Sequence, residues 1–166
     1  MIIYLLRHGD YDKSGSLSEL GKKQIKLIAK NLVNENIDAI YCSPIQRCVE
    51  CSKIINKKLK LEVEFDERIR ERDKVLGEPK TQQEKLWWEN YLNPSFSSRN
   101  PEGCKEFFER VFDFVEELKN KKQSRVLVIA HSALLYAMLY YVYKPQNQLA
   151  IWNSLSNGGY VRFEIN

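Results

Sequence analysis

Apolar residues along the chain form two patterns, short uninterrupted runs and runs at helical spacing. The uninterrupted runs are rich in Ile, Leu and Val, which is typical of strands buried on both faces of a parallel sheet. A shorter segment, Leu61 to Phe65, alternates apolar and polar residues, and an Asn157-Gly158-Gly159 turn divides the tail into two short runs. The predicted strands are Ile2 to Leu6, Asp38 to Cys42, Leu61 to Phe65, Arg125 to Ala130, and two within Leu149 to Ile165.

Helical spacing and capping residues place helices between these strands. Ser18 is a favourable N-cap, and Ser43-Pro44 predicts a second helix start, with serine as the cap and proline at the first helical position. The predicted helices are Ser18 to about Asn34, Ser43-Pro44 to Lys57–Lys60, about Thr81 to Leu92, Asn100-Pro101 through Leu118, and Ser132 to about Tyr143. This alternation predicts a three-layer α/β/α sandwich with a mostly parallel central sheet.

The length of 166 residues predicts one domain, residues 1–166, with a cap-like insert at about 72–100. The insert follows a charged loop, Asp66 to Lys80, and ends in a Ser/Pro/Asn-rich linker, Asn93 to Asn100. We expect the insert to form a roof over the substrate.

The net charge of +4 suits an anionic ligand but is too small to indicate nucleic acid. The longest apolar stretch, Ala133 to Tyr143, is far shorter than the roughly 20 residues that cross a bilayer, so no membrane association is expected. Met1 leads directly into the first predicted strand without the charged start of a signal peptide, which predicts a cytoplasmic protein. The sequence leaves the oligomeric state open.

Four cysteines are present, and two of them, Cys48 and Cys51, form a C-x-x-C pair. Such a pair can serve redox chemistry or bind a metal. Here it falls inside a predicted helix, and no second pair completes a zinc site. We therefore expect reduced thiols that pack as small apolar residues, and no metal.

The chain has two histidines, and each follows the end of a buried strand: His8 after the first run and His131 after Arg125 to Ala130. If both strands are central in one parallel sheet, both imidazoles emerge at the same edge, where ligands of open α/β sheets bind. Arg7 accompanies His8, and Arg47 lies about one turn inside a helix that begins at the same edge. Two guanidinium groups and two imidazoles together suit a phosphoryl group.

Five segments resemble the histidine phosphatase superfamily, the phosphoglycerate-mutase-like family with an RHG motif, and they occur in the family's order over nearly the whole chain. They are LLRHG (5–9), LSELGKKQ (17–24), SPIQRC (43–48), RIRERDKVLGE (68–78) and VLVIAHS (126–132). The resemblance implies that His8 attacks phosphorus and forms a phosphohistidine, and that Arg7, Arg47 and His131 bind the phosphoryl oxygens together with it.

The same resemblance implies that Glu71 is the general acid and then the general base, with Glu67 and Glu78 as alternatives. The expected reaction is hydrolysis of a small-molecule phosphate ester, with inorganic phosphate as product and no cofactor.

Two other functions stay open. One is phosphoglycerate mutase activity, which we consider less favoured because the chain is short and lacks the mutase substrate loop. The other is a phospho-ligand binding module with little catalysis, suggested by Asp10-Tyr11 after RHG and by Ser132, where the family usually has glycine.

The insert offers cations and aromatic residues for a substrate, or alternatively for a solvated face and helix packing. They are Lys74, Lys80, Lys85, Arg99, Trp87, Trp88 and Tyr91. Sugar phosphates, nucleotide-like phosphates and phosphoproteins cannot be ranked from these residues.

Overall fold

The structure is a computed structural model that describes residues 1–72, 80–91, 93–99, 101–144 and 155–165. Five strands and five α-helices alternate along most of these residues, with two short 3-10 helices at Val33–Glu35 and Glu67–Ile69. The strands are β1 (Ile2–Arg7), β2 (Ala39–Cys42), β3 (Val63–Phe65), β4 (Arg125–Ala130) and β5 (Tyr160–Glu164). The helices are α1 (Glu19–Leu32), α2 (Gln46–Leu59), α3 (Gln82–Glu89), α4 (Cys104–Lys119) and α5 (Ser132–Tyr143).

The strands form one sheet in the order β3-β2-β4-β1-β5, in which only β5 runs antiparallel to its neighbour. The predicted mostly parallel sheet is therefore confirmed. β1 and β4 lie side by side, and their register pairs Arg7 with Ala130. Each histidine follows directly after this pair, so the register itself brings His8 and His131 to the same edge.

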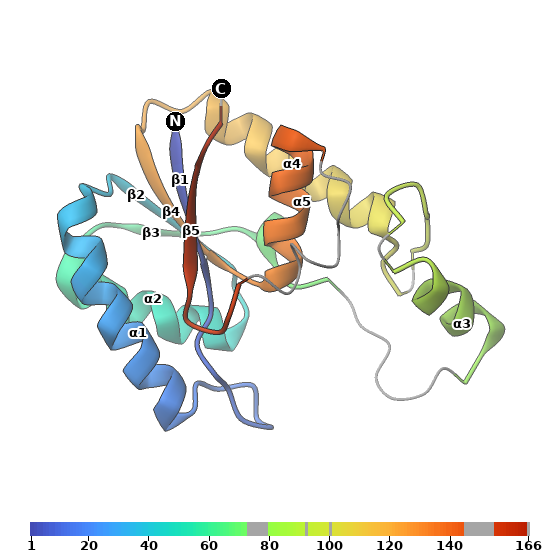
Figure 1. Cartoon of the computed structure of the whole chain (residues 1–166), viewed down its shortest axis with the longest axis horizontal. Coiled ribbons are helices and arrows are strands. Elements are labelled where there is room, and N and C mark those ends of the chain that lie inside the picture. The colour runs from blue at the N-terminus through green and yellow to red at the C-terminus, as the bar shows by residue number, and fades with distance from the viewer. Residues whose placement is uncertain (73–79, 92, 100, 145–154, 166) are drawn as a thin grey trace.

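Side chains of the central strands alternate between two apolar cores. Tyr4 and Leu6 of β1 pack with Ile25 of α1 and Ile55 of α2 on one face. Ile3 and Leu5 pack on the other face in a core that includes residues of α4 and α5. Both faces of the sheet are thus covered, which gives the three layers visible in Figure 1. α3 lies beyond the sheet, near the start of α4 (Figure 1).

Two helices begin later than their sequence pattern predicts. The predicted start of α2 at Ser43-Pro44 is wrong: Ile45 is the N-cap, and the hydroxyl of Ser43 contacts His131 instead. Of the predicted start of α4 at Asn100-Pro101, Asn100 lies outside the described residues, and Pro101 is not helical: α4 begins at Cys104, after a turn in which Gly103 N donates to Ser98 O at 2.6 Å. A Cβ on Gly103 would lie 2.4 Å from Ser98 N, so this turn requires glycine.

The Asn157-Gly158 turn is confirmed, and it fastens the end of β1. Gly158 has a φ of +69°, which favours glycine, and its N–H donates to His8 O at 2.9 Å. Of the two strands predicted in the tail, β5 is confirmed, whereas the first begins in 145–154, outside the described residues. Among the described helices, none has the length and apolar character needed to cross a membrane.

Candidate active site

The carboxyl ends of β1 and β4 bring the two histidines together. His8 and His131 are 2% and 1% exposed, and their ring centroids are 5.2 Å apart. The backbone N–H of His8 donates to Ala130 O at 3.0 Å, which continues the ladder between the two strands by one bond. The expectation that both imidazoles share one sheet edge is confirmed.

Hydrogen bonds determine which nitrogen of neutral His8 carries the proton. Its Nδ1 lies 2.8 Å from Gly9 O. A carbonyl oxygen only accepts, so Nδ1–H is the donor, and the neutral ring keeps its lone pair on Nε2. The imidazole is thereby prepared to use Nε2 as a nucleophile.

His131 is held from both sides by residues that follow β2. Its Nε2 lies 2.9 Å from the hydroxyl of Ser43, which is fully buried, and its Nδ1 lies 3.2 Å from Arg47 Nη2. Because a guanidinium N–H can only donate, Nδ1 is the acceptor and the neutral ring carries its proton on Nε2, toward Ser43.

Two arginines supply positive charge beside the imidazoles. Arg7 donates through Nη1 to Leu155 O at 2.7 Å; burial lowers its pKa, while the nearby Glu71 opposes that shift. An arginine remains protonated in proteins, so the charge stays. Within the described part of the chain, the Nε atoms of Arg7 and Arg47 are buried and have no hydrogen-bond acceptor. Buried donors without acceptors suit an incoming phosphoryl group.

Of the three glutamates predicted as the general acid, Glu71 is the one that lies near His131 and Arg47. Its Oε2 lies 3.6 Å from His131 Nδ1 and 3.8 Å from Arg47 Nη2, and its side chain is 11% exposed. Glu67, in the 3-10 helix before it, is exposed to solvent, whereas both histidines are buried. Glu78, the second alternative, lies outside the described residues.

The charges around the histidines favour an anion over a metal ion. His8, Glu71 and His131 each offer one ligand atom within 4.8 Å of the others. Arg7 and Arg47 beside them would repel a cation, so the group fits an anion better.

Tyr11 completes the site, and sequence reasoning noted it only as a departure from the family pattern. Its ring meets His8 edge-on with centroids 5.1 Å apart, and the Arg47 guanidinium lies 4.7 Å from its centroid. Tyr11 is 43% exposed and therefore forms part of the rim. The signal in the sequence that could have identified Tyr11 as a site residue is its position, two residues after Gly9.

Trp87 and Tyr91 of the insert both make packing contacts. Trp87 is fully buried and donates through Nε1 to Glu102 O at 2.8 Å, and Tyr91 packs against the Arg72 guanidinium. Helix packing, the alternative to a substrate wall, therefore describes Trp87, whereas Tyr91 also lies near Glu71, whose carboxylate adds to burial in raising the pKa of Tyr91. The cations Lys80, Lys85 and Arg99 are exposed, whereas Lys74 and the side chain of Trp88 lie outside the described part.

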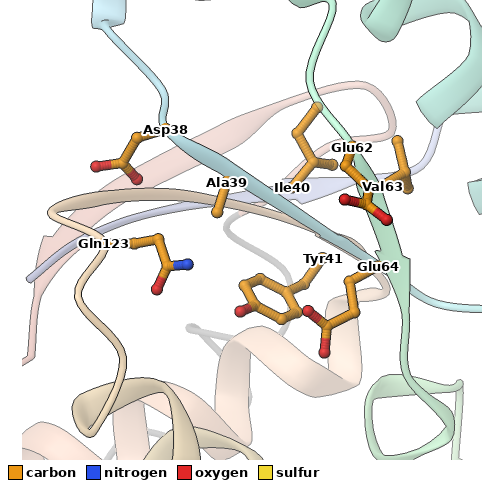
Figure 2. Close-up of a pocket in the computed structure, with 8 residues that line it drawn as sticks. All are labelled: Asp38, Ala39, Ile40, Tyr41, Glu62, Val63, Glu64 and Gln123. Carbon is orange, nitrogen blue, oxygen red and sulfur yellow. The ribbon is translucent and has the colours of Figure 1, made fainter.

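A hollow of about 540 Å³ lies against β2 and β3, and Figure 2 shows its lining. Asp38, Glu62 and Glu64 contribute carboxylates there, and Asp38 precedes β2 at the end of the strand away from Ser43. Carboxylates repel phosphate, so this hollow is not the candidate active site.

All four cysteines are free and buried. Burial raises the pKa of Cys42 and Cys51 to about 12, and it raises that of Cys48 well above its usual value. Neutral buried thiols are poor nucleophiles and metal ligands, in agreement with the packing role predicted for the C-x-x-C pair.

Comparison with known proteins agrees with this geometry. Residues 3–166 match the family model "Histidine phosphatase superfamily (branch 1)". "Putative phosphoserine phosphatase 2" of Hydrogenobacter thermophilus is 28% identical over 159 residues, which cover 82% of this chain and 76% of that protein. "Probable phosphoglycerate mutase GpmB" of Yersinia pestis is 26% identical over 155 residues, covering 82% of this chain and 72% of that protein.

A solved structure has the same fold. The alpha-ribazole phosphatase of Shigella flexneri superposes with a TM-score of 0.77 at 19% identity, covering 100% of this chain and 91% of that one.

Proposed function

The chain belongs to the histidine phosphatase superfamily and is a phosphatase, and on this premise we propose that it hydrolyses phosphate monoesters of small metabolites through a phosphohistidine on His8. The observation that carries the proposal is the convergence of His8, Glu71 and His131, whose polar atoms lie within 4.8 Å of one another beside two arginines. Each comes from a different segment, so their meeting depends on the whole fold.

In the first half-reaction, the Nε2 lone pair of neutral His8 attacks phosphorus. The bond between phosphorus and the ester oxygen breaks, and that oxygen takes its electron pair and a proton from the Glu71 carboxyl group. Arg7 and Arg47 hold the other phosphoryl oxygens together with His131, which donates from Nδ1 when its ring is protonated on both nitrogens, and these groups stabilise the charge spread over the oxygens. The alcohol leaves, and a phosphohistidine and a Glu71 carboxylate remain.

In the second half-reaction, Glu71 acts as a base. Its carboxylate takes a proton from water as the water oxygen bonds to phosphorus. The P–N bond breaks and its electron pair returns to Nε2, which restores neutral His8 and releases inorganic phosphate. No metal or other cofactor takes part in the proposed steps.

The insert, about 72–100 within the single domain 1–166, is proposed to set the substrate class. Its described residues include α3 and the turn before α4, and the backbone N–H of Arg72 donates to Glu71 Oε1 at 3.3 Å. We place the enzyme in the cytoplasm because free, buried thiols are typical of a reducing compartment.

The test is a panel of phosphate esters with the wild type, His8→Ala and Glu71→Gln. We expect His8→Ala to lose activity by about 10³-fold or more, and the wild type alone to show a phosphoenzyme on His8. Glu71→Gln should reduce kcat/KM most for esters with poor leaving groups, because these need the proton. A wild type that forms no phosphoenzyme would contradict the proposal and favour a binding module.

Mutase activity is the remaining alternative. Mutase activity is distinguished from hydrolysis by comparing the release of inorganic phosphate with phosphoryl transfer between phosphoglycerates. Dominant transfer would show that the released product is held and phosphorylated again, and the hydrolase proposal would then be wrong.

A further inference from the structure

We propose that Arg110 of α4, paired with Glu102, is a positioning residue that holds Glu71 at the correct place for proton transfer. The inference rests on the proposed role of Glu71 and adds to it the means by which the acid is located. Glu71 belongs to neither a helix nor a strand: the 3-10 helix ends at Ile69, and residues 71 and 72 have no regular hydrogen bonding. Its backbone must therefore be fixed by other groups.

Arg110 makes those contacts from the neighbouring helix. Its Nη1 donates to Arg68 O at 2.5 Å and to Arg70 O at 3.1 Å, and its Nη2 lies 3.5 Å from Glu71 O. One guanidinium thus holds three carbonyl groups in a span of four residues. This span ends at the carbonyl of the proposed acid.

Glu102 fixes the guanidinium in turn. Arg110 Nε donates to one carboxylate oxygen at 2.7 Å, and Arg110 Nη2 donates to the other at 2.8 Å. These two bonds and the three carbonyl contacts match the five N–H donors of an arginine. The side chains of Arg110 and Glu102 are 16% and 9% exposed, so solvent competes little for the pair.

Arg72, the residue after Glu71, is also hydrogen-bonded to Glu102. Arg72 is 2% exposed, and it donates through Nε to the backbone carbonyl of Glu102 at 3.2 Å and through Nη1 to Tyr91 O. Glu71 is therefore held on both sides by groups that meet at Glu102. The contacts of Arg110 with this segment are to backbone carbonyl oxygens, so Arg110 acts on the acid through the backbone.

The consequence is specific to proton transfer, because His8 and the phosphate-binding groups stand on other elements. Displacement of a reacting group by about 1 Å can reduce a rate by about 10²-fold. Loss of Arg110 should therefore slow only the esters whose leaving oxygen needs the Glu71 proton.

The experiment compares kcat/KM of wild type and Arg110→Met for an alkyl phosphate and for 2,4-dinitrophenyl phosphate. This parameter reports the half-reaction that forms phosphohistidine, in which dinitrophenolate leaves without protonation. We expect Arg110→Met to lose about 10²-fold on the alkyl ester and to change little on the aryl ester. Equal losses on both esters would overturn the proposal, since a general structural defect affects both.

Two further variants keep the test decisive if Arg110→Met folds poorly. Glu102→Gln keeps the size of the side chain and one acceptor, and should give a smaller loss with the same dependence on the leaving group. Arg110→Lys keeps the charge but cannot form the fork, and should restore little of the activity. Full activity in Arg110→Lys would overturn the hydrogen-bonding role.

A double variant distinguishes this inference from the proposed function. If Arg110 acts only through Glu71, Arg110→Met should add no loss on the alkyl ester when Glu71→Gln is already present. Additive losses would overturn the positioning role while leaving Glu71 as the acid. A Glu71→Gln variant with no leaving-group dependence would instead overturn the proposed function, and this inference with it.

Arg125→Met is the matched control. Arg125 is also a partly buried arginine that donates to a backbone carbonyl, Glu35 O at 3.1 Å, but it stands at the start of β4, away from the histidines. Arg125→Met should leave the ratio of kcat/KM for the alkyl ester to kcat/KM for the aryl ester unchanged.

Discussion

At the scale of single residues, the site depends on which groups can only donate and which can only accept. The Gly9 carbonyl sets the proton of His8 on Nδ1, and Arg47 sets that of His131 on Nε2. The two rings thus present different nitrogens to their surroundings, although both follow equivalent strand ends. The hydroxyl oxygen of Ser43 accepts the hydrogen bond from His131 Nε2–H, which explains why this buried serine does not cap α2.

Replacing Ser43 by alanine tests this assignment. The variant leaves the buried Nε2–H of His131 without its 2.9 Å partner, so the ring is free to turn away from the phosphoryl group. We expect kcat/KM to fall by about tenfold, equivalent to ~1.4 kcal/mol, on alkyl and aryl esters alike. The free energy of unfolding should fall by about 1–3 kcal/mol.

Ser52→Ala is the control for Ser43→Ala. Ser52 is 2% exposed and donates to Val49 O within α2 at 2.9 Å. Its replacement should lower stability without changing kcat/KM, as measured by urea unfolding and steady-state kinetics. Equal kinetic effects of the two substitutions would contradict the role given to Ser43.

At the scale of elements, the sequence predicts best what depends on local pattern. The runs that became β1 and β4 are apolar on both faces, and the Ser18 cap forms its bond to Gly21 N at 3.1 Å. The starts of α2 and α4 were missed because distant groups determine them, namely His131 for one and the turn at Ser98 for the other. Sequence pattern could not place Glu71 for the same reason: its segment is fastened by a residue of α4.

The contact between α1 and the segment after β1 gives a prediction at Gly21. A Cβ there would lie 2.0 Å from Asp10 O, although alanine is the better helix former by about 1 kcal/mol. Gly21→Ala should therefore push Asp10 and Gly9 outward, lowering both the melting temperature and kcat. Lys23→Ala, on the exposed side of α1, should leave both quantities nearly unchanged. A more stable Gly21→Ala variant would show that the close approach is not obligatory.

At the scale of the whole molecule, the arginines of the site and the carboxylates of the hollow lie at different places on the sheet. The carboxyl ends of β1 and β4 lead into the histidines, beside Arg7 and Arg47, whereas the hollow of Figure 2 is lined by carboxylates along β2 and β3. A phosphate ester is therefore favoured beside the arginines and disfavoured in the hollow. Between them, the core over α1 and α2 contains three thiols, of Cys42, Cys48 and Cys51, that take no part in the proposed chemistry.

Because of these thiols, the free energy of unfolding of the whole chain should change with pH in the alkaline range. Burial raises the pKa of Cys51 from 9.0 to about 12, so in the folded state this thiol stays protonated where the unfolded chain has lost the proton. A pKa raised by folding contributes stability below the unfolded value and loses it as pH rises toward the folded one. The free energy of unfolding should therefore decline between about pH 9 and pH 12, by up to ~1.4 kcal/mol per pH unit for each such thiol.

Urea unfolding of wild type and Cys51→Ala from pH 7.5 upward measures this slope. The variant should be less stable near neutral pH, because it leaves a small cavity, but its stability should decline less steeply above pH 9. Ile55→Ala, in the same core, removes apolar volume without a titrating group, so its curve should run parallel to that of the wild type. Parallel curves for Cys51→Ala as well would mean that the thiol ionises equally in both states, and that the core around it admits water.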